Sequence, residues 1–194
     1  AGINMMESRL LEENGRAHFM TRRFDRTEGN SKIHTQTLCG IAHYDYKMFH
    51  AYSYEQAFQV MRKLRLPYSQ AEEMYHRMVF NVIARNQDDH TKNISFIMDK
   101  NGKWSLSPAY DMSWAYNPTG AWTSAHQMSV NNKWDNIDKK DLIAVAENVN
   151  IKHAGQIVEQ VVDAVSKWTK LSAENGIPKD ISQSIDKTLL YRNF

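Results

Sequence analysis

The order of apolar and polar residues changes character along the chain. Between residues 5 and 26, short apolar runs flank Glu13-Asn14-Gly15, which is typical of two strands joined by a turn. A polar stretch with one glycine, Thr27 to Lys32, separates this segment from the rest. From there the signals are mostly helical. The pattern therefore predicts an N-terminal hairpin followed by a mainly helical body.

Capping signals and apolar periodicity predict two helices in the middle of the chain. Ser53 and Gln56 have the spacing of a capping box and predict a helix to about Leu64. Ser69 and Glu72 repeat that spacing and predict the start of another helix. Its apolar residues recur at helical spacing and end just before Asn86: Ala71, Met74, Tyr75, Met78, Val79, Val82 and Ile83. A loop beginning at Asn86 would therefore extend from a firmly packed helix.

A second hairpin is predicted shortly after this helix. Residues 93–98 and 103–107 flank an Asn-Gly pair, which favours a tight turn. The hairpin would bring Asn93 and Asp111 together although they are distant in sequence. Residues 112–136 contain turn residues, three Trp and no period. We expect a loop there that lines a cleft or contacts a partner.

The last third of the chain is expected to be helical. Asp138 can cap a helix over about residues 139–149. Apolar periodicity from Ile157 through Leu171 predicts one long amphipathic helix. A final helix should begin at Pro178 or Asp180.

Composition narrows the class of protein. The chain has 194 residues, enough for one well-buried domain, and 42% of them are hydrophobic. Its formal net charge is 24 − 22 = +2, so charge alone indicates neither nucleic-acid nor membrane binding. No apolar run approaches the roughly 18 residues of a membrane span. Cys39 is the only cysteine, which excludes an intramolecular disulfide and fits a buried apolar role in a reducing cytoplasm.

Three polar residues have the spacing of a phosphoryl-transfer site. Asp88 and Asn93 are five apart, as in a kinase catalytic loop, and Asp111 follows the predicted hairpin. Such a site needs a carboxylate to orient and deprotonate the attacking hydroxyl, and an amide and a carboxylate to hold Mg²⁺. The alternative is a polar helix–strand connection in which Asp88 caps and Asn93 sits in a turn.

Other site types fit less well. A calcium loop starting at Asp88 would need Gly at its sixth position and Glu at its twelfth, where Asn93 and Asp99 stand. No helix-borne His pair indicates zinc, and no serine-hydrolase elbow is present. His90 is expected to orient the loop by hydrogen bonding, whereas Lys92 could either neutralise transferring charge or lie on the surface.

The charged run at residues 22–26 also allows two interpretations. As a group of charges it fits an exposed strand edge. Phe24 within it instead indicates a clamp on a planar ligand.

At these residues the sequence resembles the HipA family of bacterial serine/threonine kinase toxins. The resemblance rests on three motifs in order: Arg23-Phe24-Asp25-Arg26, then Asn86-x-Asp88-x-His90-x-Lys92-Asn93, then Leu106-Ser107-Pro108-Ala109-Tyr110-Asp111. Weaker similarity extends over nearly the whole chain. The resemblance implies an α+β, mainly α fold: a protein-kinase-like C-lobe with two small β-hairpins. Residues 1–26 would be the last N-lobe strands and the hinge, and residues 27–194 the helical C-lobe.

The resemblance also implies roles for individual residues. Asp88 would be the catalytic base, with His90 and Lys92 in the same catalytic motif. Asn93 and Asp111 would bind Mg²⁺. For ATP, the implied residues are Arg22 and Phe24 at the hinge, which meets adenine through backbone groups, and Asp25 near the ribose.

The family further implies partners. Its members phosphorylate a serine or threonine of a translation factor, with aminoacyl-tRNA synthetases as characterised substrates. A helix-turn-helix antitoxin neutralises the kinase and carries the complex to operator DNA. A cytoplasmic location and no membrane partner are expected.

Two departures from the family pattern qualify the expected activity. Arg22 stands where the family usually has Glu, which a backbone hinge contact would tolerate. The chain has no G-x-G-x-x-G, and its first lysine is Lys32, so the phosphate-gripping parts of a kinase would lie before Ala1. We therefore expect a fragment that is inactive alone. The alternative is a non-catalytic module that binds an antitoxin or another protein.

Overall fold

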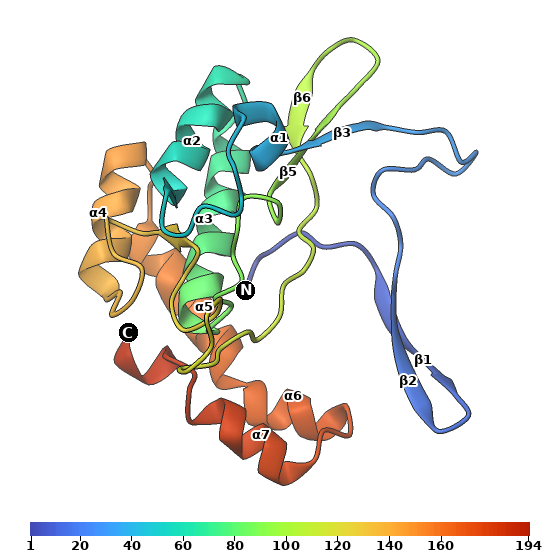
Figure 1. Ribbon diagram of the computed structural model, residues 1–194, viewed down its shortest axis with the longest axis vertical. Helices are drawn as coiled ribbons and strands as arrows, with labels where there is room; N and C mark the ends of the chain where they lie inside the picture. Colours follow the sequence, from blue (N-terminus) through green and yellow to red (C-terminus); the bar gives the residue numbers. More distant parts are fainter.

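The computed structural model describes residues 1–194 and shows a helical body from which an N-terminal hairpin projects (Figure 1). The helices are α1 (Leu38–Ala42), α2 (Tyr54–Lys63), α3 (Tyr68–Ile83), α4 (Lys139–Val149), α5 (Ala154–Ser166), α6 (Trp168–Glu174), α7 (Lys179–Asp186) and a final 3₁₀ turn (Tyr191–Asn193). The strands are β1 (Ser8–Glu13), β2 (Arg16–Thr21), β3 (His34–Thr37), β4 (Tyr52–Ser53), β5 (Ser95–Met98), β6 (Trp104–Leu106) and β7 (Met128–Ser129). The predicted α+β, mainly α class is confirmed.

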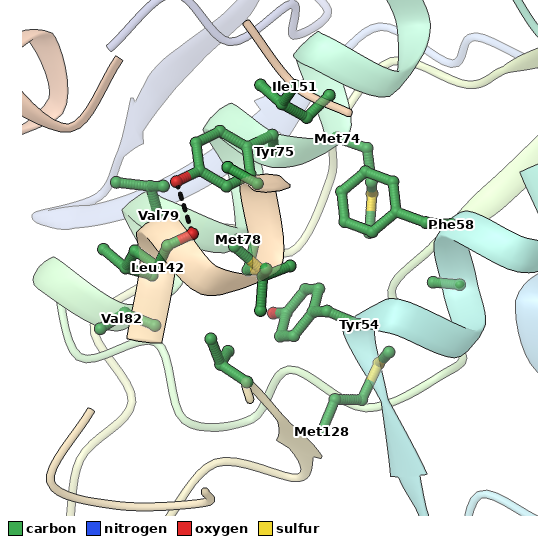
Figure 2. Close-up of a cluster of buried hydrophobic side chains, with 14 of the residues drawn as sticks. Tyr54, Phe58, Met74, Tyr75, Met78, Val79, Val82, Met128, Leu142 and Ile151 are labelled. Carbon is green, nitrogen blue, oxygen red and sulfur yellow. Dashed lines mark hydrogen bonds between the residues drawn. The ribbon is translucent and has the colours of Figure 1, made fainter. Parts of the chain in front are cut away.

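Helix α3 runs through the centre of the core. Its predicted apolar stripe is buried, and Met74, Tyr75 and Met78 have no exposed surface. Figure 2 shows these side chains packed among residues of α2, α4 and the segment that contains Met128. The Tyr75 hydroxyl donates to the Leu142 carbonyl at 2.9 Å, so the one polar atom of this ring is satisfied. Because α3 is packed so tightly, the loop that follows it starts from a rigid base.

Two of the three predicted helix caps are confirmed. Ser53 and Gln56 form a reciprocal capping box at the start of α2, and Asp138 caps α4 in the same way with Asp141. The box predicted at Ser69 is wrong. Helix α3 already begins at Tyr68, directly after Pro67, whose extended backbone starts the helix without a side-chain cap.

The single long helix predicted from 157 to 171 is also wrong. It breaks at Lys167 into α5 and α6, and α6 packs against α7. The Trp168 indole N–H donates to the Ser182 carbonyl at 3.0 Å across this α6–α7 contact. Apolar periodicity did not reveal the break because apolar residues keep helical spacing past Lys167, although Leu171 is 46% exposed in the structure.

Both predicted hairpins are present. Strands β1 and β2 pair antiparallel around Asn14 and Gly15, which both have positive φ. The β5–β6 hairpin is extended by β3 into a three-stranded sheet, a strand that the sequence pattern did not predict. Within the predicted loop 112–136, β7 pairs in parallel with β4 and so fixes this loop to the start of α2.

Two smaller expectations concern Cys39 and membranes. Cys39 is half-buried rather than fully buried, and its thiol donates to the Tyr44 carbonyl at 3.0 Å. None of the helices combines the length and the apolar character needed to cross a bilayer.

Candidate active site

The loop that follows α3 is held in a defined shape by its own polar groups. The helix ends at Ile83, and Arg85 turns the chain with φ +57°. The Asn93 side-chain amide donates across the loop to the Asp88 carbonyl at 2.8 Å, and the Asn93 N–H donates to the His90 carbonyl at 2.9 Å. These bonds leave the side-chain oxygen of Asn93 without a protein partner.

Asp88 presents its carboxylate to solvent. The side chain is 49% exposed, and the His90 Nε2 atom lies 3.9 Å from its carboxylate. That separation is too long for a hydrogen bond. Both carboxylate oxygens of Asp88 are therefore free to accept a proton or a hydrogen bond from a hydroxyl group.

Asp111 lies in a turn with a left-handed backbone. Its φ of +56° is in a region shared by several Asn and His residues of this chain, and Asp adopts this region more readily than most residues. Its carboxylate is exposed and makes no hydrogen bond or ion pair. The Asn86 side-chain amide lies 3.5 Å from the Asp111 carbonyl, so the loop that follows α3 contacts this turn.

Two adjoining pockets share Asp111. A narrow polar pocket is lined by Asn93 and Asp111 together with His90 and Asn86. A larger pocket of about 580 Å³, within the usual range for small-molecule sites, is lined by the hairpin, the segment around Phe24, and Asp111. The tertiary structure thus brings Arg22, Phe24 and Asp25 to the same pocket as Asp111. Asp88 lines neither pocket. Its backbone carbonyl accepts a hydrogen bond from Asn93, which lines the narrow pocket.

An aromatic pair joins the two sides of this site. The rings of Phe24 and Tyr110 stack with centroids 5.6 Å apart. The Tyr110 hydroxyl donates to the Lys92 carbonyl at 2.6 Å and makes a short hydrogen bond with the Ser95 hydroxyl. Burial raises the pKa of Tyr110, which keeps this hydroxyl a donor. The floor of the large pocket is therefore tied to the loop that carries Asp88.

The residues at the narrow pocket fit a magnesium ion. Asn93 and Asp111 both line it, and each has a side-chain oxygen with no protein partner. Mg²⁺ is often held by one or two protein oxygens together with phosphate oxygens and water. No group of three His, Cys, Asp or Glu side chains forms a separate metal cluster.

Comparison with known proteins identifies the family. A family model described as the HipA-like C-terminal domain matches residues 1–169. The chain belongs to this family. HipA of Shewanella oneidensis MR-1, solved with HipB and its operator DNA, has the same fold with a TM-score of 0.75 at 18% identity. The match covers 99% of this chain and 51% of that HipA chain, so the HipA-like domain spans about half the length of its structural relative. No curated protein matches the chain in sequence.

Within the HipA-like domain, Asp25 is already engaged by arginines. Its carboxylate accepts from Arg23 at 2.7 and 2.5 Å and from Arg26 at 2.6 Å. The hydrogen bond from Arg23 lowers the pKa of Asp25 below its usual value. Two arginines therefore balance the charge of the Asp25 carboxylate.

Lys92 and His90 point toward an aromatic side chain. The Lys92 ammonium lies 3.3 Å from the centre of the Tyr46 ring, and His90 contacts the same ring edge-on. Lys92 lines neither pocket, whereas His90 lines the narrow one with a buried Nδ1 that has no partner. The structure therefore places His90 at the site and Lys92 beside it.

Sequence reasoning missed one residue of this loop. Asp89 is 3% exposed and accepts hydrogen bonds from three groups, all of them 35 to 38 residues away along the chain. A second Asp beside Asp88 gave no signal of burial, because two adjacent acidic residues are equally compatible with a solvated loop.

Proposed function

We propose that this HipA-like domain carries the nucleotide- and magnesium-binding part of a serine/threonine protein kinase, the toxin of a toxin–antitoxin pair. The observation that carries the proposal is the convergence of Phe24 and Asp25, from the segment after the hairpin, with Asp111 at one pocket. Asp111 also borders the loop that bears Asp88 and Asn93. The family membership and the HipA-like fold support the same activity.

The proposed roles follow from the state of each side chain. Asp88, half-exposed and unpaired, would accept the proton of the substrate hydroxyl. Asn93 and Asp111 would hold Mg²⁺ through their unpartnered oxygens. When bound, the ion supplies neutralisation of phosphate charge. The stacked Phe24 and Tyr110 rings form an apolar wall against which a planar base would pack.

The residues named above do not include groups that would bind the transferring phosphate. The sequence contains no G-x-G-x-x-G, and its first lysine is Lys32. Turnover by residues 1–194 alone is therefore expected to be weak, so activity should be measured on the full-length protein that carries this domain.

The partners are proposed by analogy. Because the Shewanella HipA was solved with HipB and operator DNA, we propose a small helix-turn-helix antitoxin as the partner, with DNA contacted through it in the cytoplasm. The substrate would be a protein hydroxyl, with an aminoacyl-tRNA synthetase as the first candidate.

Mg·ATP binding to the full-length protein tests the metal and nucleotide roles. We expect Asp111→Asn to weaken ATP binding at least tenfold when Mg²⁺ is present and to leave metal-free binding unchanged. Asp163→Asn is the matched control, since this exposed α5 carboxylate pairs only with Lys167. Equal Mg·ATP affinity of the wild type and Asp111→Asn would overturn the assignment.

Phosphoryl transfer tests the base. Asp88→Asn should keep Mg·ATP binding and lower transfer about 10²–10⁴-fold, the usual contribution of a general base. If the wild-type protein binds Mg·ATP and its antitoxin but transfers no phosphate, the non-catalytic interaction module is the correct alternative.

A further inference from the structure

Asp89 lies at the centre of a buried polar cluster beside the proposed base. Its carboxylate accepts from the Tyr54 hydroxyl at 2.7 Å and from the backbone N–H of Gln127 at 2.8 Å, and it lies 2.9 Å from His126 Nδ1. The side chains of Asp89 and His126 are 1% and 2% exposed. A buried carboxylate is stable only when its oxygens are satisfied in this way, so its donors are held in fixed directions.

The cluster continues to the turn that bears Asp111. The Asn81 amide donates to the Tyr54 hydroxyl at 2.8 Å, and the Asn86 amide donates to the Asn81 side-chain oxygen at 3.0 Å. The same Asn86 amide lies 3.5 Å from the Asp111 carbonyl. One chain of polar contacts therefore runs from the backbone of the proposed metal ligand through α3 and α2 to Asp89.

The segment that follows Asp111 is attached to the α3–β5 loop at both ends. Near its start, Ala115 exchanges backbone hydrogen bonds with Arg85 and Gln87 at 3.0 and 3.1 Å. At its far end, His126 and the backbone of Gln127 bind Asp89. Between these points the chain carries Trp122, which is exposed and stacks on Phe49 with ring centroids 4.3 Å apart. Asp89 is thus the far-end attachment of a surface segment that begins at the proposed metal site.

We infer that Asp89 is a positioning residue for the proposed phosphoryl transfer: it holds residues 112–127 and the adjoining Asp88 in one arrangement. The inference rests on the proposed function for its catalytic consequence. The physical reason is adjacency, because Asp88 and Asp89 share a peptide unit. A change in the donors around Asp89 therefore turns the backbone that aims Asp88, and a shift of about 1 Å in a reacting group can cost 10²-fold in rate.

A purely stabilising role is the competing explanation, and the chain offers a matched control. Asp141 is also 3% exposed and accepts from Lys133 at 2.8 Å, Asn131 at 2.9 Å and the Asp138 N–H at 2.9 Å. It belongs to the α4 capping box and lines neither pocket. Asp141→Asn therefore removes an equally buried carboxylate without touching the site.

The experiment compares Asp89→Asn, Tyr54→Phe and Asp141→Asn in the full-length protein, well below each unfolding midpoint. We expect Asp89→Asn to lower kcat for phosphoryl transfer about 10²-fold while KM for Mg·ATP changes less than threefold. Tyr54→Phe, which keeps the ring packed in the core (Figure 2), should lower kcat several-fold. Asp141→Asn should lower the unfolding midpoint and leave kcat unchanged.

Hydrogen exchange supplies a readout that does not depend on activity. In Asp89→Asn and Tyr54→Phe, amides of residues 115–127 should exchange at least tenfold faster, and those of α5 should not. Unchanged exchange there, or kcat losses that match those of Asp141→Asn, would overturn the inference. A wild type without transfer activity would refute the proposed function, whereas faster exchange confined to residues 115–127 would still support the attachment by Asp89.

Discussion

The N-terminal hairpin and the body around α3 are built on different physical principles. Every residue of β1 and β2 is exposed, so the hairpin is held by its own ladder of hydrogen bonds and little burial. The body buries Phe96, Tyr54 and the α3 stripe from Met74 to Ile83 completely. A two-stranded hairpin alone is marginal in water, whereas a packed core makes its loops rigid.

The difference matters because the candidate site lies between these regions. Part-buried hydrogen bonds join Asn93 to the Asp88 carbonyl and Asn86 to the Asp111 carbonyl, so the body holds this side of the site. Ser8 and Thr21 of the hairpin line the larger pocket together with Asp111. One side of the pocket is therefore pre-organised and the other is held weakly. We expect ligand binding to change the hairpin more than the loop of Asp88.

The largest contrast should come from truncating one phenylalanine in each region. Phe96→Ala in β5 should destabilise the protein by about 3–5 kcal/mol, because a fully buried ring leaves a cavity. Phe19→Ala in β2 should change the stability by less than about 0.5 kcal/mol, because this side chain is 69% exposed. Urea unfolding measures both changes. Similar losses for the two variants would show that the hairpin is not an independent, weakly packed region.

A smaller contrast is expected for two serine hydroxyls. Ser53→Ala should cost about 1 kcal/mol, because Ser53 caps α2 through the Gln56 N–H. Ser8→Ala removes an exposed hydroxyl bond to Thr21 at 2.9 Å and should cost a few tenths of a kcal/mol at most. Ser69→Ala is the control within the body and should behave like Ser8→Ala, since α3 has no side-chain cap. A loss near 1 kcal/mol in Ser69→Ala would contradict the observed start of α3.

The smallest effect concerns the pH response of Asp25, at the junction of the two regions. Since Arg23 lowers the pKa of Asp25, the ionised carboxylate stabilises the folded state above the ordinary carboxyl pKa of about 4. This contribution is lost as pH falls through the lowered folded-state pKa. In Arg23→Gln, an NMR titration should show the Asp25 pKa moved up toward its ordinary value.

Arg22→Gln is the control for that titration. Arg22 approaches Glu28 at 3.8 Å rather than Asp25, so the Asp25 titration should not move. A shift of equal size in both variants would mean that general positive charge, and not the Arg23 hydrogen bond, depresses the Asp25 pKa.

Local signals in the sequence predicted much of the fold correctly. The cap at Ser53, the cap at Asp138 and the Asn-Gly turns each depend on interactions within a few residues, and all are confirmed. The cap predicted at Ser69 was wrong because α3 already begins at Tyr68, directly after Pro67. The prediction of one continuous helix through Lys167 was wrong for a different reason. The break there depends on the contact between α6 and α7.

By itself, the sequence determined the helical body, both hairpins, the HipA-like family, and the spacing of Asp88, Asn93 and Asp111. These properties follow from short-range periodicity and from motifs that are contiguous in the chain. Only the tertiary structure brought Phe24 and Asp25 to the pocket of Asp111 and showed which of two adjacent aspartates is buried. Burial of Asp89 depends on Tyr54, His126 and Gln127, which lie 35 to 38 residues away, and such distant partners leave no local pattern.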